Sequence, residues 1–311
     1  MKSKPPPSRN VSLKKLSLAL AVGLAGSALL ATPAQARQGK LLLTGGVSSI
    51  DGAAGGGLTP WAVTGSYASQ DELGGSVFVT RLRSQDYGLT TRGALLAWGE
   101  RMEFSLARQE LDTGATGTAL GLPGLRLRQD IAAVKWRLAG DAVLDADQWM
   151  PQLALGAEFK RAHSGGLAPT LASLGAGARG TDLYLSATKL VLAQGLLLNA
   201  TLRVTKANQN GLLGFGGTAS EGYSLQPEFS VAYLLGRRLA LGAEYRSKPD
   251  KLNPSALGAG LREQDWRDLF VAWTPSKQLS LTAAYVDLGA IVPAVKPRRQ
   301  TGAYLSLQLA F

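Results

Sequence analysis

The sequence contains no cysteine and only one histidine, and these absences exclude several kinds of functional site. Without cysteine the chain cannot form a disulfide scaffold, a thiol nucleophile, a cysteine-ligated zinc site or a lipid-modified N-terminal cysteine. A single imidazole cannot build a histidine metal cluster. We therefore predict no metal site and no cofactor.

Long apolar runs are also scarce. After residue 36, no segment reaches the roughly 18 consecutive apolar residues of a membrane-spanning helix. The one long run, residues 16–31, follows a cationic start and precedes Ala34-Gln35-Ala36, which is the pattern of a secretory signal peptide and its cleavage site. We predict that residues 1–36 are removed and that residues 37–311 form one exported domain.

The exported part carries little net charge. The predicted signal peptide holds five basic and no acidic residues, so its removal lowers the net charge from +11 to +6. No block rich in lysine and arginine remains along the sequence, and nucleic-acid binding needs clustered positive charge. We expect no nucleic-acid partner.

Short alternating segments of apolar and polar residues fill the exported part, and glycine, asparagine, aspartate and proline separate them. This pattern predicts antiparallel strands joined by turns. We predict about fourteen strands, centred near Leu43, Val63, Val79, Ala94, Ser105, Val134, Leu155, Ser186, Thr201, Ser230, Gly242, Phe270, Thr282 and Leu305.

The predicted connections alternate between short and long. The long ones are residues 48–60, 112–125, 161–180, 208–222, 249–265 and 289–300, and only the connections at 83–86 and 139–148 break the pattern. Short periplasmic turns and long external loops are typical of bacterial outer-membrane barrels, whose termini both face the periplasm. The fold class we predict is all-β, a transmembrane antiparallel up-and-down β-barrel.

The two faces of the predicted strands agree with a barrel in lipid. In residues 196–205, leucine, alanine and valine alternate with asparagine, threonine and arginine. A sheet can span hydrocarbon only if it closes and leaves no unpaired edge. Aromatic residues near the strand ends predict two girdles, one with Tyr67, Trp98, Trp136, Tyr233, Trp273 and Phe311, the other with Trp61, Tyr223, Tyr245 and Trp266.

The last predicted strand carries the most specific signal. Leu305, Leu307 and Leu309 share a face with the terminal Phe311, and Gly302 precedes them. This arrangement resembles the C-terminal signal by which outer-membrane barrels are recognised for assembly; an ordinary edge strand is the alternative. We expect the protein in the outer membrane of a Gram-negative bacterium, after export through the inner membrane. Expected partners are outer-membrane lipid, lipopolysaccharide and the barrel-assembly machinery, and the oligomeric state is left open.

Four stretches carry a likeness to a known family: residues 39–62 and 139–145, GLLGFGG at 211–217 and AYVDLG at 284–289. On these stretches the sequence resembles a domain-of-unknown-function family of Gram-negative outer-membrane β-barrel proteins. The likeness covers essentially all of the exported part. It implies the barrel and its location but no activity, because the family has none assigned.

Strand parity predicts which charged residues line the lumen. A lone charge facing lipid near the bilayer midplane would cost about 2–4 kcal/mol. We therefore place nine charged residues inside: Lys135, Arg137, Glu158, Lys160, Arg203, Glu228, Glu244, Arg246 and Asp268. Such mixed charge favours a pore or transporter for small solutes. The alternative is a closed structural or surface-interaction barrel, in which these residues pair across strands and block the bore.

The first long connection, residues 48–60, is small and apolar for a segment expected in external water. Glycine suits a chain packed close to other backbone. We hypothesise that it folds inward and constricts the barrel mouth, with Ile50, Asp51, Gly55, Gly56, Gly57 and Leu58 at the constriction. The alternative is a mobile glycine loop without lumen contacts.

Two further motifs suggest chemistry but fit it poorly. His163-Ser164 resembles part of a catalytic triad, yet a triad is defined by geometry, and neighbouring strand residues point to opposite faces. Asp141, Asp145 and Asp147 lack the spacing of an EF-hand calcium loop, so we interpret them as turn residues. We predict that the protein is not an enzyme.

Overall fold

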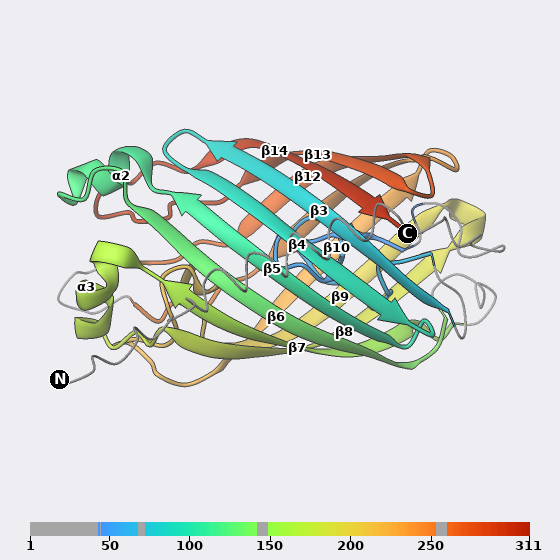
Figure 1. Ribbon diagram of the computed structural model, residues 1–311, viewed down its shortest axis with the longest axis horizontal. Coiled ribbons are helices and arrows are strands. Elements are labelled where there is room, and N and C mark those ends of the chain that lie inside the picture. Colours follow the sequence, from blue (N-terminus) through green and yellow to red (C-terminus); the bar gives the residue numbers. More distant parts are fainter. Residues whose placement is uncertain (1–42, 44, 68–71, 142–148, 253–259) are drawn as a thin grey trace, which may run out of the picture. The chain divides into compact units, whose positions relative to one another are not determined.

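The computed structural model describes residues 43, 45–67, 72–141, 149–252 and 260–311. The predicted signal peptide and its cleavage site lie outside these residues. Within this part of the chain, twelve antiparallel strands form one closed barrel (Figure 1). They are β3 (Leu73–Ser84), β4 (Gly88–Trp98), β5 (Met102–Asp112), β6 (Arg126–Ala139), β7 (Gln152–His163), β8 (Arg179–Val191), β9 (Leu196–Thr205), β10 (Ser224–Leu234), β11 (Leu239–Arg246), β12 (Trp266–Ser276), β13 (Leu279–Asp287) and β14 (Thr301–Ala310).

Each strand pairs with the next in the sequence, and β14 pairs with β3 to close the wall. The barrel and its closure confirm the predicted all-β, antiparallel class. The predicted count of about fourteen is wrong, because the first two predicted strands are not part of the wall. The other twelve predicted centres each fall within one barrel strand.

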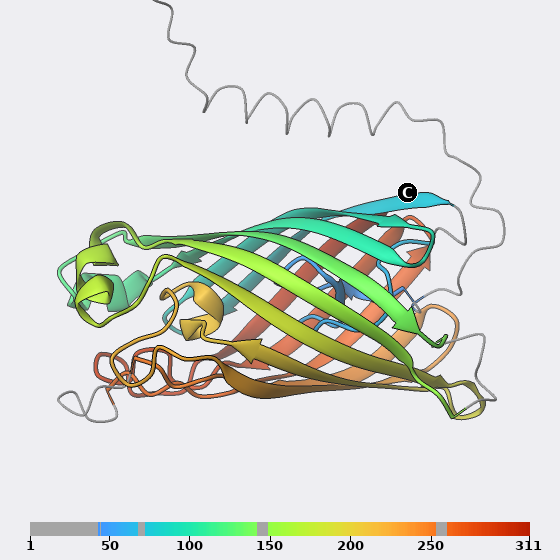
Figure 2. The same ribbon diagram turned by 90° about the horizontal axis from the view of Figure 1, so that it is seen from below.

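The extra strand predicted near Val63 belongs to a stretch inside the barrel, residues 45–66, which we call the plug (Figure 2). The other extra strand was predicted around Leu43, which precedes the plug. The only regular structure of the plug is a small antiparallel sheet of β1 (Val47–Ser48) and β2 (Ala54–Gly55). Residues 45–66 are buried almost throughout. The loss of these two predicted strands does not change which residues of the later strands are predicted to face the lumen.

Strand periodicity sorts the wall residues into two faces. In β9, Leu198 and Leu202 are exposed on the outside, whereas Asn199, Thr201 and Arg203 are buried inside. Trp98, Trp136, Tyr233, Trp273 and Phe311 are exposed near one end of the barrel. The placement of Trp61 and Trp266 in an external girdle is wrong, because both are buried: Trp61 lies in the plug and Trp266 points inward from β12.

The two ends of the barrel differ. The turn end carries the start of β3, the C-terminus, and the connections at 99–101, 140–151, 192–195, 235–238 and 277–278. The loop end carries the longer connections at 113–125, 164–178, 206–223, 247–265 and 288–300, with the short turn 85–87 as its exception. The plug joins β3 at the turn end.

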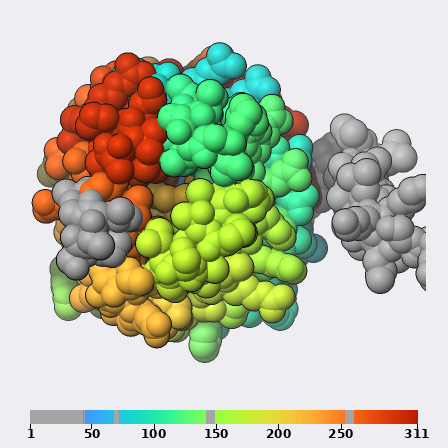
Figure 3. Space-filling view, turned by 90° about the vertical axis from the view of Figure 1, so that its left-hand side faces the viewer, coloured from blue at the N-terminus to red at the C-terminus, as the bar shows by residue number. Residues whose placement is uncertain are grey.

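Short helices lie within the connections. The loop end holds α2 (Gly114–Ala119), η1 (Gly165–Leu167), α3 (Ala168–Ser173) and η3 (Asn208–Gly211), and the turn end holds η2 (Leu192–Gln194). Seen from the loop end, the connections with α2 and α3 lie side by side over much of the barrel mouth (Figure 3). Among the described residues, no helix has the length and apolar character needed to cross a membrane.

Candidate functional site: the plugged lumen

The structure places eight of the nine charged residues that sequence parity assigned to the lumen as buried side chains inside the barrel. They come from β6, β7 and β9–β12, where each occupies an inward position of the alternation. The ninth, Arg137, is half-buried at the turn end, where it pairs with Glu100 at 3.6 Å and Asp141 at 3.1 Å.

Asp51 of the plug lies among three basic side chains of the wall. Its Oδ2 atom is 2.6 Å from Arg246 Nη1 and 3.9 Å from Arg203 Nη2, and its Oδ1 atom is 3.8 Å from Lys160 Nζ. Gln109 also donates a hydrogen bond to Asp51 Oδ1 at 3.2 Å. One plug carboxylate is thus held by charged and polar groups from four strands.

The same basic residues also pair with carboxylates of the wall. Arg203 contacts Glu228 at 2.5 Å and Glu158 at 2.7 Å. Lys160 lies 2.9 Å from Glu158 and 2.8 Å from Asp182, and Arg246 lies 3.4 Å from Glu228. The wall part of this network therefore contains three cations and three anions, and its charge is balanced without the plug.

A separate ion pair of the wall also holds the plug. Glu103 of β5 and Lys135 of β6 are cross-strand neighbours, 3.1 Å apart and buried. Glu103 accepts hydrogen bonds from the Ala54 and Gly65 amides, both at 3.0 Å. Lys135 donates to the Ala54 carbonyl at 2.9 Å and the Val63 carbonyl at 2.8 Å. This pair binds backbone groups of the plug, so it does not depend on the side chains there.

Glu244 of β11 supplies a third contact. It accepts hydrogen bonds from the Leu58 amide at 2.7 Å, the Thr59 amide at 3.2 Å and the Thr59 hydroxyl at 2.7 Å. Gly56 permits this approach, because a Cβ atom there would lie only 2.0 Å from Glu244 Oε1. Asp268 is the cross-strand neighbour of Glu244, and in the described part of the chain neither of its carboxylate oxygens accepts a hydrogen bond.

Neutral polar side chains complete the recognition of the plug backbone. The Pro60 carbonyl accepts hydrogen bonds from Thr201 at 2.9 Å and from Ser186 and Asn199 at 3.3 Å. Gln152 donates to the Ala62 carbonyl at 2.7 Å, while the Ala62 amide donates to the Thr188 hydroxyl at 2.8 Å. The buried backbone of the plug is therefore paired partly within the plug itself and partly with wall side chains.

All six residues predicted at a constriction lie inside the barrel and are buried: Ile50, Asp51, Gly55, Gly56, Gly57 and Leu58. They do not belong to an external loop between two wall strands, so that part of the hypothesis is wrong. The error follows from the strand count, because the segment precedes the first wall strand and joins it at the turn end.

A second segment closes the lumen at the loop end. Residues 206–216, which include η3, fold inward, and Asn208, Gln209 and Asn210 are buried. The backbone amide of Gln209 donates a hydrogen bond to the Glu263 carboxylate at 2.8 Å, and its side-chain oxygen accepts one from Lys248 at 2.7 Å. Gln129 of β6 donates to the Asn210 carbonyl at 3.1 Å. We call residues 206–216 the cap.

The two charged residues that hold the cap are themselves buried, in the connection between β11 and β12. Burial raises the pKa of the Glu263 carboxyl to about 7, although nearby Lys248 opposes the shift. Burial also lowers the pKa of the Lys248 ammonium to about 8. Lys248 Nζ lies 3.7 Å from Glu263 Oε2 and 4.8 Å from the centre of the Trp266 ring.

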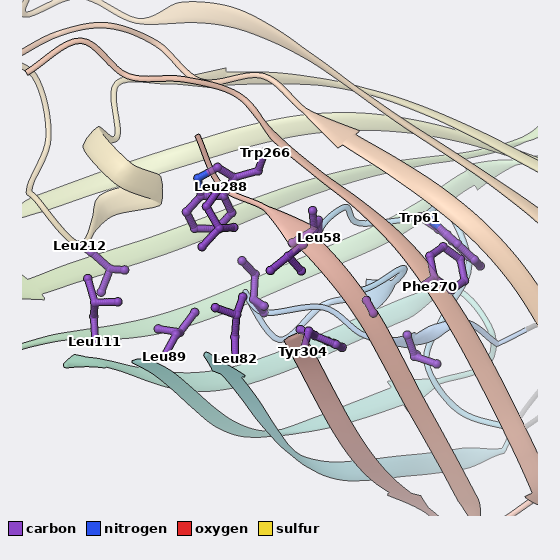
Figure 4. Packing of buried hydrophobic residues seen from close by; sticks show 14 of the residues in the cluster. Leu58, Trp61, Leu82, Leu89, Leu111, Leu212, Trp266, Phe270, Leu288 and Tyr304 are labelled. Atoms are coloured by element: carbon purple, nitrogen blue, oxygen red, sulfur yellow. The ribbon is translucent and has the colours of Figure 1, made fainter. Parts of the chain in front are cut away.

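The plug and the cap contact one shared cluster of buried apolar side chains (Figure 4). Leu58 and Trp61 contribute from the plug and Leu212 from the cap. The wall contributes Leu82, Leu89, Leu111, Trp266, Phe270 and Tyr304, among others. The lumen is thus filled by polar contacts around the plug and by apolar packing between the plug and the cap.

Sequence reasoning missed Glu103, Asp182 and the cap. Asp182 lies in a segment without clean alternation, because Tyr184 and Leu190 point inward with it. Glu103 occupies an inward position of β5 with Ser105 and Gln109, so parity alone would have found it. The cap was treated as an ordinary external loop, although the apolar residues Leu212, Leu213 and Phe215 signalled burial.

The remaining candidate residues lie on the outer wall or in turns. Leu305, Leu307, Leu309 and Phe311 of the predicted assembly signal are exposed on the outside of the barrel, and Gly302 pairs with Ser84 across the seam. His163 Nε2 lies 3.1 Å from Asp130 Oδ2, and among the described residues no hydrogen bond joins it to Ser164. Asp145 and Asp147 lie outside the described residues.

The fold and its contents define a closed antiparallel β-barrel with an apolar outer face and a plugged lumen. The chain belongs to the family described as a protein of unknown function (DUF3034), whose model matches residues 44–308. The predicted membership in a domain-of-unknown-function family is thus confirmed. A search of the curated proteins found no match.

Solved structures of other barrels are similar to this chain. The NanC porin shares 8% identity with a TM-score of 0.48, over 76% of this chain and 98% of that one. An outer membrane channel from Pseudomonas putida F1 shares 12% identity with a TM-score of 0.47, over 79% and 97%. Outer membrane phospholipase A from Escherichia coli shares 10% identity with a TM-score of 0.40, over 75% and 89%. At these identities the likeness concerns the fold alone.

Proposed function

We propose that the protein is an outer-membrane pore or transporter for small solutes and that the plug closes it in this structure. The observation that carries the proposal is the charge balance of the wall network around Asp51. With the plug removed, Lys160, Arg203 and Arg246 still face Glu158, Asp182 and Glu228. An open state would therefore leave the wall network without excess charge.

The noncovalent contacts of the plug are compatible with its release from the lumen. All its contacts with the wall are hydrogen bonds, ion pairs and apolar packing, and the chain has no cysteine to fix it covalently. A barrel of more than about eight strands has a bore wider than side chains alone readily fill. With the plug removed and the cap open, a twelve-stranded wall would leave a path lined by the eight predicted residues that lie inside the barrel.

The outer face supports a location in a membrane. Large apolar side chains are exposed around the wall, such as Leu106, Phe159, Phe229 and Leu269. Exposed apolar surface of this extent is unfavourable in water and favourable in lipid. Together with the resemblance of the last strand to an assembly signal, this supports placement in the outer membrane of a Gram-negative bacterium.

A permanently closed structural barrel is the second candidate. Dense ion pairing around Asp51 and the second closure by the cap favour it, because both would resist opening. We propose no enzymatic role, since His163 pairs with Asp130 on the outer wall and not with Ser164. We propose no cofactor either.

Conductance of the purified protein in planar bilayers tests the proposal. Deleting residues 45–66 should produce large steps whenever the cap opens, whereas the full chain should open rarely. A matched pair sharpens the test: deleting residues 52–57 of the plug should raise conductance, and deleting the six residues of α3 (Ala168–Ser173) should not. Heat-modifiable gel migration shows that each variant is folded. A folded variant that lacks both residues 45–66 and the cap residues 206–216 and still stays silent would establish the closed structural barrel.

A further inference from the structure

Arginines gather on the outer face of one half of the wall. Strands β3–β8 carry eight that are exposed on the outside: Arg81, Arg83, Arg92, Arg108, Arg126, Arg128, Arg161 and Arg179. Each lies within four residues of the loop end of its strand. The sequence shows no basic block, because the arginines are spread over about a hundred residues and only strand pairing brings them together.

The register of the sheet joins these residues into adjacent rows. One row runs across five strands as Arg92, Arg108, Asp130, Arg161 and Arg179, each directly opposite the next. The neighbouring row towards the loop end contains Arg81, Thr90, Glu110, Arg128 and His163. Arg83, Gly88, Asp112 and Arg126 form a third. We call this surface the arginine belt.

Acidic residues of the belt neutralise only part of its charge. Glu110, Asp112 and Asp130 oppose eight arginines, which leaves a net charge of +5 if His163 is neutral. Arg108 lies 2.6 Å from Asp130, and Arg92 lies 3.3 Å from Glu110. Within the described part of the chain, Arg81, Arg83, Arg161 and Arg179 form no ion pair.

Arg161 and Arg179 are the centre of this unbalanced charge. They are direct cross-strand neighbours, and like charges in that position destabilise a sheet. Asp130, which lies opposite Arg161, is already paired with Arg108 and His163. Two adjacent guanidinium groups without a carboxylate form a site that an external anion would stabilise.

The other half of the wall provides the contrast. On β9–β14 the only basic side chain that the described strands direct outward is Arg267, and the remaining outward positions are mostly leucine, valine and aromatic residues. The excess positive charge is therefore confined to one face. If the membrane environment in general required arginines on the outer face, they would be expected on both halves of the wall.

We infer that the arginine belt binds the phosphorylated headgroups of lipids in the outer leaflet. Guanidinium groups match phosphate oxygens through paired, charge-assisted hydrogen bonds. The belt lies on the lipid-facing surface and near the loop end, where charged side chains meet headgroups at little energetic cost. A ligand with several phosphates on one headgroup would satisfy several arginines at once.

Native mass spectrometry of the full protein in detergent, with diphosphorylated lipid A as the probe, tests this inference. The double variant R161Q/R179Q should bind lipid A about tenfold more weakly, since it removes two charge-assisted contacts and leaves no carboxylate unpaired. R161K/R179K keeps the charge without the paired geometry and should fall between the two. The control R237Q/R238Q removes the same charge at the turn end and should bind like the unmodified protein.

Further arms separate the possible ligands. Lipid A stripped of its phosphates should bind poorly, and millimolar inorganic phosphate should not displace diphosphorylated lipid A. Folding of each variant is checked by heat-modifiable migration. Equal binding by the folded R161Q/R179Q variant, equal binding of the stripped lipid, or full displacement by inorganic phosphate would overturn the inference. So would self-association that R161Q/R179Q abolishes while lipid A binding stays unchanged, because the belt would then be a protein interface.

Discussion

The lumen is closed by two segments that are held in different ways. The plug receives hydrogen bonds or ion pairs from side chains of β5 to β11 and, through Ser48 and Gln308, from β14. The cap is held mainly by other connections, through Lys248, Glu263 and the Ile291 carbonyl, with Gln129 as its contact in the wall.

This difference indicates which of the two segments opens first. Strands within a closed barrel open together or not at all, whereas connections fluctuate on their own. The cap is therefore expected to open without disturbing the wall. Release of the plug requires the simultaneous loss of contacts on many strands.

The largest effect is expected from Glu103→Ala. The substitution leaves Lys135 charged, buried and without its carboxylate, which costs about 3–5 kcal/mol, and the plug loses two backbone hydrogen bonds. Urea unfolding from lipid vesicles, followed by tryptophan fluorescence, measures the loss. Glu110→Ala is the control: it breaks two pairs on the outer face, with Arg92 and Arg128, and should change stability by less than about 1 kcal/mol. Equal losses would show that the plug adds nothing to the stability of the barrel.

A smaller effect is expected from Asp51→Asn. This variant keeps the size of the side chain and weakens the contact with Arg246, while the wall network stays balanced. A hydrogen bond between charged groups contributes about 1.5–3 kcal/mol, so openings in planar bilayers should become roughly 10- to 100-fold more frequent. Asp287→Asn, which breaks the exposed pair with Arg299, should leave the frequency unchanged. If both variants behave alike, Asp51 does not hold the plug.

The smallest effect is a pH dependence of the cap, measured in a variant that lacks residues 45–66 so that only the cap closes the lumen. The pKa of Glu263 is raised in the closed state, so closure is penalised as pH rises from 4.5 to about 7. The pKa of Lys248 is lowered, so closure is penalised as pH falls from 10.5 to about 8. Between about pH 7 and 8, both groups destabilise the closed state to their full extent.

Conductance of this variant should therefore be greatest between about pH 7 and 8 and decline towards more acidic and more basic pH. The control is K248M/E263Q in the same background, whose conductance should not vary with pH in this way. A profile that both proteins share would assign the titration to groups other than Lys248 and Glu263.

The wall could be predicted from the sequence much better than the plug. Alternation placed most of the wall strands, because one side faces lipid and the other faces polar contacts. β3, β4 and β8 alternate poorly, because apolar side chains such as Phe78, Leu95 and Tyr184 point inward, and the turn residues that flank these strands placed them. The plug also has short, small and apolar stretches, but its backbone is paired with side chains such as Glu103, Lys135 and Glu244, and no local pattern reports that pairing. The strand that the sequence predicts near Val63 therefore falls within the plug.

The candidate site shows the same division. Parity assigned the inward charges of β6, β7 and β9–β12 without any knowledge of their partners. That Asp51 would contact Arg246 could not be predicted, because the two residues are far apart in the sequence and meet only when the wall has closed around the plug. The cap escaped prediction for a related reason, since its contacts come from three other connections and from the wall.

The seam between β3 and β14 has a consequence for the speed of folding. It joins the first and last wall strands, and the closure of so long a loop is slow because its entropic cost is met before its contacts form. Ser48 of the plug donates a hydrogen bond to Gln308 of β14 at 2.9 Å, while Glu103 and Lys135 hold the plug to β5 and β6. A plug that is already bound to β5 and β6 would help β14 to reach its place in the wall sooner. We therefore expect a chain without residues 45–66 to reach its native barrel more slowly than the full chain.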